Sequence, residues 1–125
     1  MFTSGENRQL SAASQIWMVL GGVLEGTEAA DLLGRIHAAD VIQPITPYLM
    51  HYLVGALIEC GEKTKALEVI KTYWGGMVSE GADTFWELYD PNDPAASPYG
   101  GTIVNSYCHA WSCAPAYFLR MYFQE

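Results

Sequence analysis

The sequence predicts an all-α fold in which helical hairpins lie in two layers. Segments that are apolar around most of the helix circumference alternate with segments that are apolar on one face only, which indicates buried inner helices and half-exposed outer helices. Helix start and stop signals separate these segments, and no stretch of useful length alternates as a strand does. The pattern is typical of a closed ring of helices or of an open solenoid.

The first expected hairpin joins an inner helix to an outer one. Apolar residues cover most of the circumference over 9–24, which predicts the inner helix. Thr27 is expected to cap the outer helix, with Glu28 and Asp31 in its first turn. The apolar face of this helix recurs at helical spacing: Ala29, Leu32, Leu33 and Ile36.

A second hairpin follows the same order. Thr46 is a predicted N-cap with Pro47 at the first helical position, and the next residues are apolar almost all round until Gly61. The outer helix is expected over 62–74, ending before Gly75-Gly76. Its expected inward residues are Ala66, Leu67, Ile70, Tyr73 and Trp74.

The last part of the chain contains a long loop and a final helix. Residues 81–102 are too rich in Asp, Pro and Gly for regular structure, and a loop of this length is usually functional or disordered. Its aromatic residues favour an ordered loop. A helical pattern returns over 105–123, with a kink or restart near Pro115.

Composition excludes several classes of partner. The 125 residues carry a net charge of −8, and the six Lys and Arg residues form no cluster. Nucleic acids and anionic membranes require a basic surface, so neither is expected as a partner. The apolar stretch 16–24 is too short to span a membrane and lacks a clear signal-peptide cleavage pattern.

The cysteines do not predict a metal site. Cys60, Cys108 and Cys113 match no disulfide framework or zinc ribbon, and we expect buried thiols. On one helix Cys108 and Cys113 would point about 140° apart, which disfavours a shared metal. No metal and no cofactor is predicted.

Candidate site residues lie where the loop enters the final helix. Glu87, His109, Trp86 and Trp111 are expected near one rim of the helical layers, where a carboxylate, an imidazole and two indoles would suit a sugar. Taken singly, each residue type has a plainer explanation. Such carboxylates are mostly solvated, and such histidines and tryptophans mostly serve side-chain packing.

Several stretches of the sequence resemble one enzyme family. "TFWELYDP", followed by a glycine-containing loop and "SYCHAWSCAPAYFL", resembles the C-terminal part of the catalytic domain of bacterial α-L-rhamnosidases. "SAASQIWMVLGGVL" and "ITPYLMHYLVGALIECG" resemble inner helices of the last hairpins of that domain. These enzymes are inverting glycoside hydrolases with an (α/α)6 barrel. The resemblance runs from about Ser11 to Phe123, with one departure at Cys108, where many relatives have asparagine.

The resemblance assigns roles to the candidate residues. It implies that Glu87 is the general base that activates water and that His109 contacts the sugar. Trp86 and Trp111 are expected, from their residue type rather than from the resemblance, to line the substrate site. Other residues of the loop are expected to have no role in the chemistry: Asp90, Asp93 and Pro94.

The resemblance also implies that residues 1–125 are a C-terminal portion of the barrel, with about five of its twelve helices and a long active-site loop at about 81–104. The family's general acid lies upstream, so the isolated chain is expected to be inactive. It is also expected to self-associate through apolar faces that the upstream remainder of the barrel would cover. The expected ligand is a rhamnose-containing glycoside.

Two alternatives remain open from the sequence. One is a different six-hairpin glycosidase that acts on another hexose. The other is a non-catalytic helical-repeat interaction module, because "GEKTKALEVIKTYW" fits the second helix of a tetratricopeptide-type repeat. The absence of a fixed repeat period and the aromatic and acidic loop disfavour the module.

Overall fold

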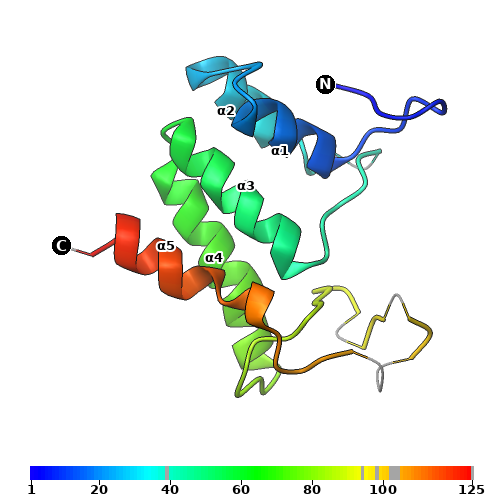
Figure 1. Cartoon of the computed structure of the whole chain (residues 1–125), viewed down its shortest axis with the longest axis vertical. Coiled ribbons are helices and arrows are strands. Elements are labelled where there is room, and N and C mark those ends of the chain that lie inside the picture. The colour runs from blue at the N-terminus through cyan, green and yellow to red at the C-terminus, as the bar shows by residue number, and fades with distance from the viewer. Residues whose placement is uncertain (39, 94, 98, 102–104, 125) are drawn as a thin grey trace. The chain divides into compact units, whose positions relative to one another are not determined.

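The computed structural model describes residues 1–125 except residues 39, 94, 98, 102–104 and 125. Within this described part the chain forms five α-helices and a 3-10 helix, with no strand, so the all-α prediction is confirmed (Figure 1). The elements are α1 (Ala12–Leu20), α2 (Gly26–Gly34), α3 (Pro47–Glu59), α4 (Lys63–Ser79), η2 (Ala110–Ser112) and α5 (Ala114–Tyr122). No helix in the described part is both long enough and apolar enough to cross a membrane.

The chain divides into two compact units. The first unit contains Met1–Pro44 and Tyr52–Leu67, and the second contains Ile45–His51 and Glu68–Glu125. Helices α3 and α4 therefore contribute residues to both units. Each unit has its own apolar core.

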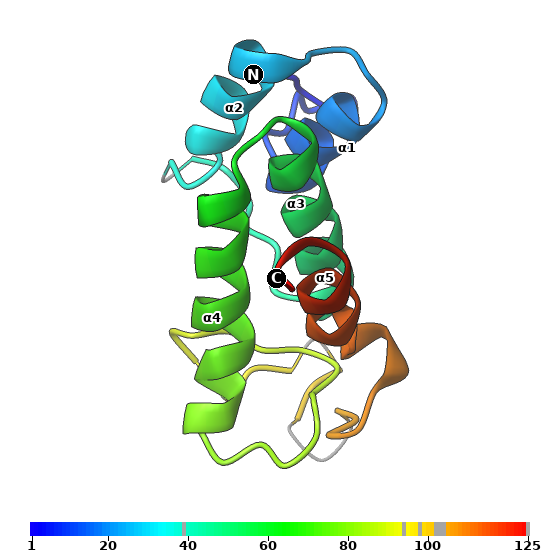
Figure 2. The same cartoon turned by 90° about the vertical axis from the view of Figure 1, so that its left-hand side faces the viewer.

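In the first unit, α1 and α2 form a hairpin with the two helices side by side (Figures 1 and 2). The predicted inner face of α2 is buried, as is the side of α1 that faces it. The core of this unit consists of Ala12, Ile16, Val19, Ala29, Leu32, Leu33, Ile36, Val41, Leu53, Val54, Ala56, Leu57 and Ala66. Burial of these apolar side chains is the main source of stability here.

Helix α1 is shorter than the predicted helix over 9–24. At its start the backbone is extended, because the N–H of Ile42 donates to the carbonyl of Leu10 (3.1 Å). At its end Gly22 has a φ of 69°, a left-handed conformation that stops a helix. The prediction was therefore right in type and wrong at both boundaries.

A buried glutamine fixes the N-terminal segment to α1. Gln15 is fully buried, and its Oε1 accepts from the N–H of Phe2 (2.8 Å). Its Nε2 donates to the carbonyls of Phe2 (2.8 Å) and Ser11 (3.0 Å). On another side of α1, Trp17 is 43% exposed and contacts Tyr52, so the helix is buried on fewer sides than predicted.

Helix α2 begins one residue before its predicted cap. Its N-cap is Glu25, which makes no side-chain capping bond, and Thr27 lies inside the first turn together with Glu28. The predicted Thr27 cap is therefore wrong, as is the place of Asp31 in the first turn. Gly26, with a φ of 54°, allows the chain to turn into the helix earlier.

Helix α3 begins and ends as predicted. The Thr46 hydroxyl accepts from the N–H of Leu49 (3.5 Å), and Pro47 is the first helical residue. The helix ends before Gly61, whose φ is 90° and whose N–H donates to the carbonyl of Ile58 (3.1 Å).

Helix α4 does not end at Gly75-Gly76, as the sequence predicts, but continues to Ser79. Gly76 instead allows the side chain of Tyr89 to approach the helix backbone closely. A Cβ atom there would lie 2.7 Å from the Tyr89 hydroxyl oxygen and 2.9 Å from the ring atom Cε1. Glycine is therefore needed at this helical position, because the Tyr89 ring lies against the backbone and leaves no room for a side chain.

The predicted helix over 105–123 is correct only in its second half. Residues before η2 are not helical, because they hydrogen-bond to the loop after α4. Pro115 lies in the first turn of α5, where its missing N–H costs nothing. The core of the second unit consists of Met50, Ile70, Tyr73, Trp74, Met77, Leu88, Tyr89, Ala114 and Phe118.

Candidate active site

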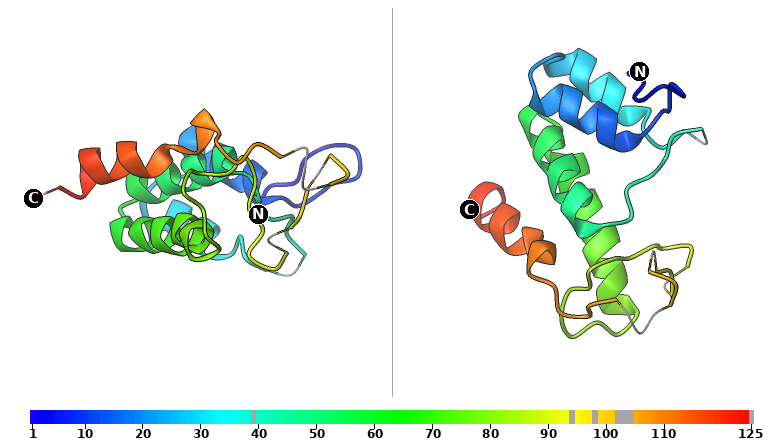
Figure 3. Two further views of the ribbon diagram at one scale, coloured as in Figure 1. Left: turned by 90° about the horizontal axis from the view of Figure 1, so that it is seen from below. Right: turned by 45° about the vertical axis from the view of Figure 1, so that its right-hand side comes forward.

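Two segments of the second unit run beside each other and carry the predicted site residues (Figure 3). Residues 84–87 follow α4, and residues 106–112 lead into α5; we term them the paired segments. The N–H of Glu87 donates to the carbonyl of Ser106 (2.8 Å), and the N–H of His109 donates to the carbonyl of Phe85 (3.0 Å). The Thr84 hydroxyl also donates to the carbonyl of Tyr107. The predicted loop is therefore ordered here by its contacts with a distant part of the chain.

Both carboxylate oxygens of Glu87 accept hydrogen bonds. The N–H of Ser106 donates to Oε2 (2.9 Å), and the hydroxyl of Tyr99 donates to Oε1 (2.9 Å). The Ser106 amide has the largest effect in holding the pKa of Glu87 below its ordinary value, and the Tyr99 hydroxyl adds to it. His109 contributes a smaller electrostatic effect in the same direction. Glu87 is therefore ionised at neutral pH and fixed in orientation.

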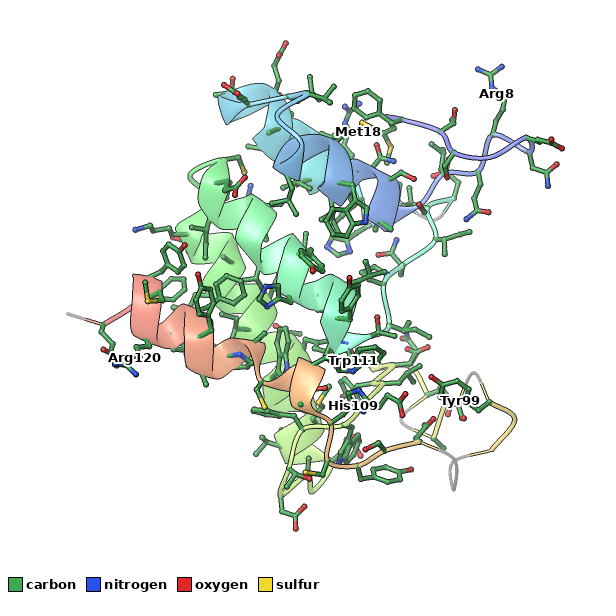
Figure 4. All side chains as sticks on the ribbon, viewed as in Figure 1. Arg8, Met18, Tyr99, His109, Trp111 and Arg120 are labelled. Atoms are coloured by element: carbon green, nitrogen blue, oxygen red, sulfur yellow. The ribbon has the colours of Figure 1, made fainter. Side chains whose placement is uncertain are left out.

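His109 and Trp111 lie next to each other (Figure 4). Their ring centroids are 4.4 Å apart, and Trp111 Nε1 donates to the backbone carbonyl of Glu87 (3.2 Å). The Trp111 side chain is 39% exposed, and its centroid lies 5.6 Å from that of Tyr48 at the start of α3. An exposed aromatic surface thus adjoins the carboxylate.

Trp86 has a supporting position. Its ring makes edge contacts with Tyr107, at a centroid distance of 5.5 Å, and with Tyr89, at 6.1 Å. Its backbone carbonyl accepts from the hydroxyl of buried Ser112 (2.6 Å). Trp86 therefore joins an aromatic cluster that stiffens the segment carrying Glu87.

Helix α4 donates two side-chain hydrogen bonds to backbone carbonyls of the second unit, one of them within the paired segments. Trp74 Nε1 donates to the carbonyl of Ser112 (2.8 Å), and the Tyr73 hydroxyl donates to the carbonyl of Ile45 (2.8 Å). The N–H of Tyr89 donates to the same Ile45 carbonyl (3.1 Å). Burial raises the pKa of Tyr73, so its hydroxyl keeps its proton and remains a donor.

The acidic residues that follow Glu87 form local turns. Asp90 Oδ1 accepts from the N–H of Asn92 (2.9 Å), and Asp93 Oδ1 accepts from the N–H of Ala95 (3.2 Å). These bonds are typical of Asx turns in loops. Pro94 and four other positions of the expected loop at 81–104 lie outside the described residues.

The prediction of three buried thiols is wrong. Cys108 and Cys113 are exposed, and Cys60 is half-buried. Cys108 precedes η2 and Cys113 caps it, so these two residues do not belong to one continuous helix as the sequence pattern suggests. The helical spacing used to place them does not apply.

Three residues that hydrogen-bond to the candidate site residues were not singled out from the sequence. Tyr99 stands in an irregular stretch, and the Ser106 backbone amide and the Ser112 hydroxyl act on atoms far away in sequence. Only the aromatic content of the loop signalled that it is ordered. No periodic pattern could have paired these groups with their partners.

Solved structures of two enzymes are similar to this chain. A rhamnosidase from Klebsiella oxytoca with rhamnose bound matches 99% of the chain at 46% sequence identity, with a TM-score of 0.90. The GH78 family rhamnosidase of Bacillus sp. GL1 matches 90% of the chain at 30% identity, with a TM-score of 0.74. The chain spans 24% and 12% of these two proteins, respectively. No protein-family model and no curated protein matches the chain.

Proposed function

Since this chain is similar in sequence and fold to part of the GH78 rhamnosidases, as its sequence motifs indicate, we propose that it is the base-bearing portion of an α-L-rhamnosidase. The proposed reaction is hydrolysis of terminal α-L-rhamnosides with inversion at the anomeric carbon. One observation carries this proposal: an ionised carboxylate, Glu87, is held in one orientation beside an exposed aromatic surface.

In the proposed reaction Glu87 removes a proton from water. A carboxylate has about four lone-pair positions, and Ser106 and Tyr99 occupy one on each oxygen of Glu87. The remaining positions can accept the water proton while the water oxygen bonds to the anomeric carbon. The glycosidic C–O bond breaks, and its oxygen takes a proton from a general acid roughly 6.5–9.5 Å from Glu87. We assign that acid to a part of the enzyme outside this chain.

The aromatic surface beside Glu87 supplies sugar contacts in this proposal. Rhamnose has an apolar face and a methyl group, which suit the exposed indole of Trp111. His109, next to that indole, would hydrogen-bond a sugar hydroxyl. Trp86 supports this aromatic surface through its ring contacts with Tyr89 and Tyr107. The rhamnose bound to the Klebsiella oxytoca protein supports this sugar over another hexose.

A chimaera tests the proposal. We expect the isolated chain to give no turnover of an aryl α-L-rhamnoside, because it would lack the general acid. The Klebsiella oxytoca rhamnosidase with its matching segment replaced by this chain is expected to hydrolyse the same substrate and to release β-L-rhamnose first, as NMR of the initial product would report. Turnover by the isolated chain, or a first product of α configuration, would contradict the proposal.

The isolated chain is also expected to self-associate. Helix α5 exposes large apolar side chains at Tyr117, Leu119, Met121 and Tyr122. Such surfaces usually bind a partner, which in the isolated chain would be another copy. Sedimentation velocity at micromolar concentration should detect species larger than a monomer, and a purely monomeric profile would count against this expectation.

A further inference from the structure

The hydroxyl of Tyr99 donates a hydrogen bond from a side chain to Oε1 of the Glu87 carboxylate (2.9 Å). Tyr99 is 57% exposed and lies twelve positions after Glu87, in the loop to the right of Trp111 in Figure 4. We propose that Tyr99 is a positioning residue: its hydroxyl holds Oε1 while the Ser106 amide holds Oε2, so that the carboxylate plane has one orientation. The catalytic meaning of this inference rests on the proposed function of Glu87 as the base.

The two hydrogen bonds act on different oxygens, and this is why both matter. A carboxylate held at one oxygen can still rotate about its last carbon–carbon bond. A second donor at the other oxygen removes that freedom, and a correctly oriented base needs less rearrangement to reach the transition state. The Ser106 donor belongs to the backbone of the paired segments, whereas the Tyr99 donor is a side chain that can be altered without disturbing them.

The loop is built to hold Tyr99 in place. The N–H of Tyr99 donates to the hydroxyl of Ser97 (3.2 Å), which forms a local turn. Asn105 Nδ2 donates to the carbonyl of Ala96 (2.9 Å) and so ties this turn to the residue before Ser106. The tyrosine hydroxyl and the serine amide therefore approach Glu87 from two tethered parts of the chain.

The pKa shifts of Glu87 and Tyr99 are consistent with a hydrogen bond between the two side chains. The Ser106 amide and then the Tyr99 hydroxyl lower the pKa of Glu87 most, desolvation opposes them with a smaller effect, and the His109 ring lowers the pKa slightly further. Glu87 in turn raises the pKa of Tyr99 through the same hydrogen bond, so Tyr99 remains protonated and able to donate across the neutral range. Loss of the Tyr99 hydroxyl should therefore raise the pKa of Glu87.

The direct test is a titration of the Glu87 carboxyl carbon by 13C NMR in this chain, with the signal assigned by its loss in Glu87→Gln. Tyr99→Phe removes only an exposed hydroxyl, and we expect an upward shift of the Glu87 pKa. Tyr117→Phe removes the hydroxyl of a comparably exposed tyrosine on α5 and should leave this pKa unchanged. An unchanged Glu87 pKa in Tyr99→Phe would overturn the inference.

Kinetics in the chimaera separate this inference from the proposed function. Tyr99→Phe should move the acidic limb of the kcat/KM profile to higher pH, because a less acidic base is protonated earlier as the pH falls. A limb that stays in place would overturn the positioning role. If Glu87 is not the catalytic base, the Glu87→Gln chimaera should keep full activity. That result does not depend on the NMR titration of Tyr99→Phe.

Discussion

Different forces stabilise the interior of each of the two units. The first unit is a helical assembly whose order comes from burial of apolar side chains, with Gln15 as its one fully buried polar residue among those described. In the second unit, the paired segments depend on hydrogen bonds between residues far apart in sequence. Burial fixes the position of a helix, but it is not directional. Orienting a carboxylate such as Glu87 requires donors at defined angles.

The largest effect on stability is expected from the apolar core of the first unit. Leu32 is almost fully buried, so Leu32→Ala should lower the free energy of unfolding by about 2–5 kcal/mol, measured by urea denaturation at fixed protein concentration. Val23→Ala alters an exposed apolar residue and should change it by less than about 0.5 kcal/mol. Equal effects in the two variants would refute the claim that burial stabilises this unit.

A smaller effect is expected where α4 meets Tyr89. Gly76→Ala places a methyl group against the buried Tyr89 ring and should cost about 1–2 kcal/mol of unfolding free energy. Gly75→Ala meets no atom within 4 Å and should stabilise the helix by about 0.5–1 kcal/mol. Stabilisation by both substitutions would show that Tyr89 does not lie against this turn of α4.

The smallest of these effects should come from one hydrogen bond within the paired segments. Ser112→Ala removes the donor to the Trp86 carbonyl and should cost about 1 kcal/mol. Ser79→Ala removes a hydroxyl that bonds within an exposed turn of α4, and urea denaturation should show almost no change. A Ser112→Ala variant as stable as the original chain would mean that this bond adds nothing to the paired segments.

The same contrast explains which parts of the fold were predictable. Apolar periodicity and capping signals report local and burial preferences, and they located α3 with its Thr46 cap and Gly61 stop. They misplaced the end of α4, because the reason for Gly76 is a ring thirteen positions later in the chain. They also predicted helix for residues 105–109, whose backbone bonds to the loop instead.

In the candidate site, too, some residues could be predicted from the sequence and others could not. Glu87, His109 and Trp111 were predicted from residue type and family resemblance, and the structure brings them together. Their assigned roles in catalysis and sugar binding stay predictions. The Tyr99 and Ser106 donors could not be predicted, because nothing in a local pattern specifies which distant donor will meet a carboxylate.

The central claim is that Glu87 is the catalytic base, and kinetics of the chimaera test it most directly. Glu87→Gln keeps the size of the side chain and removes its basicity, so kcat on an aryl α-L-rhamnoside should fall by about 10²–10⁴-fold. Glu68→Gln makes the same change on the exposed face of α4 and should leave kcat unaltered. A Glu87→Gln chimaera that turns over as fast as the Glu68→Gln chimaera would contradict the account.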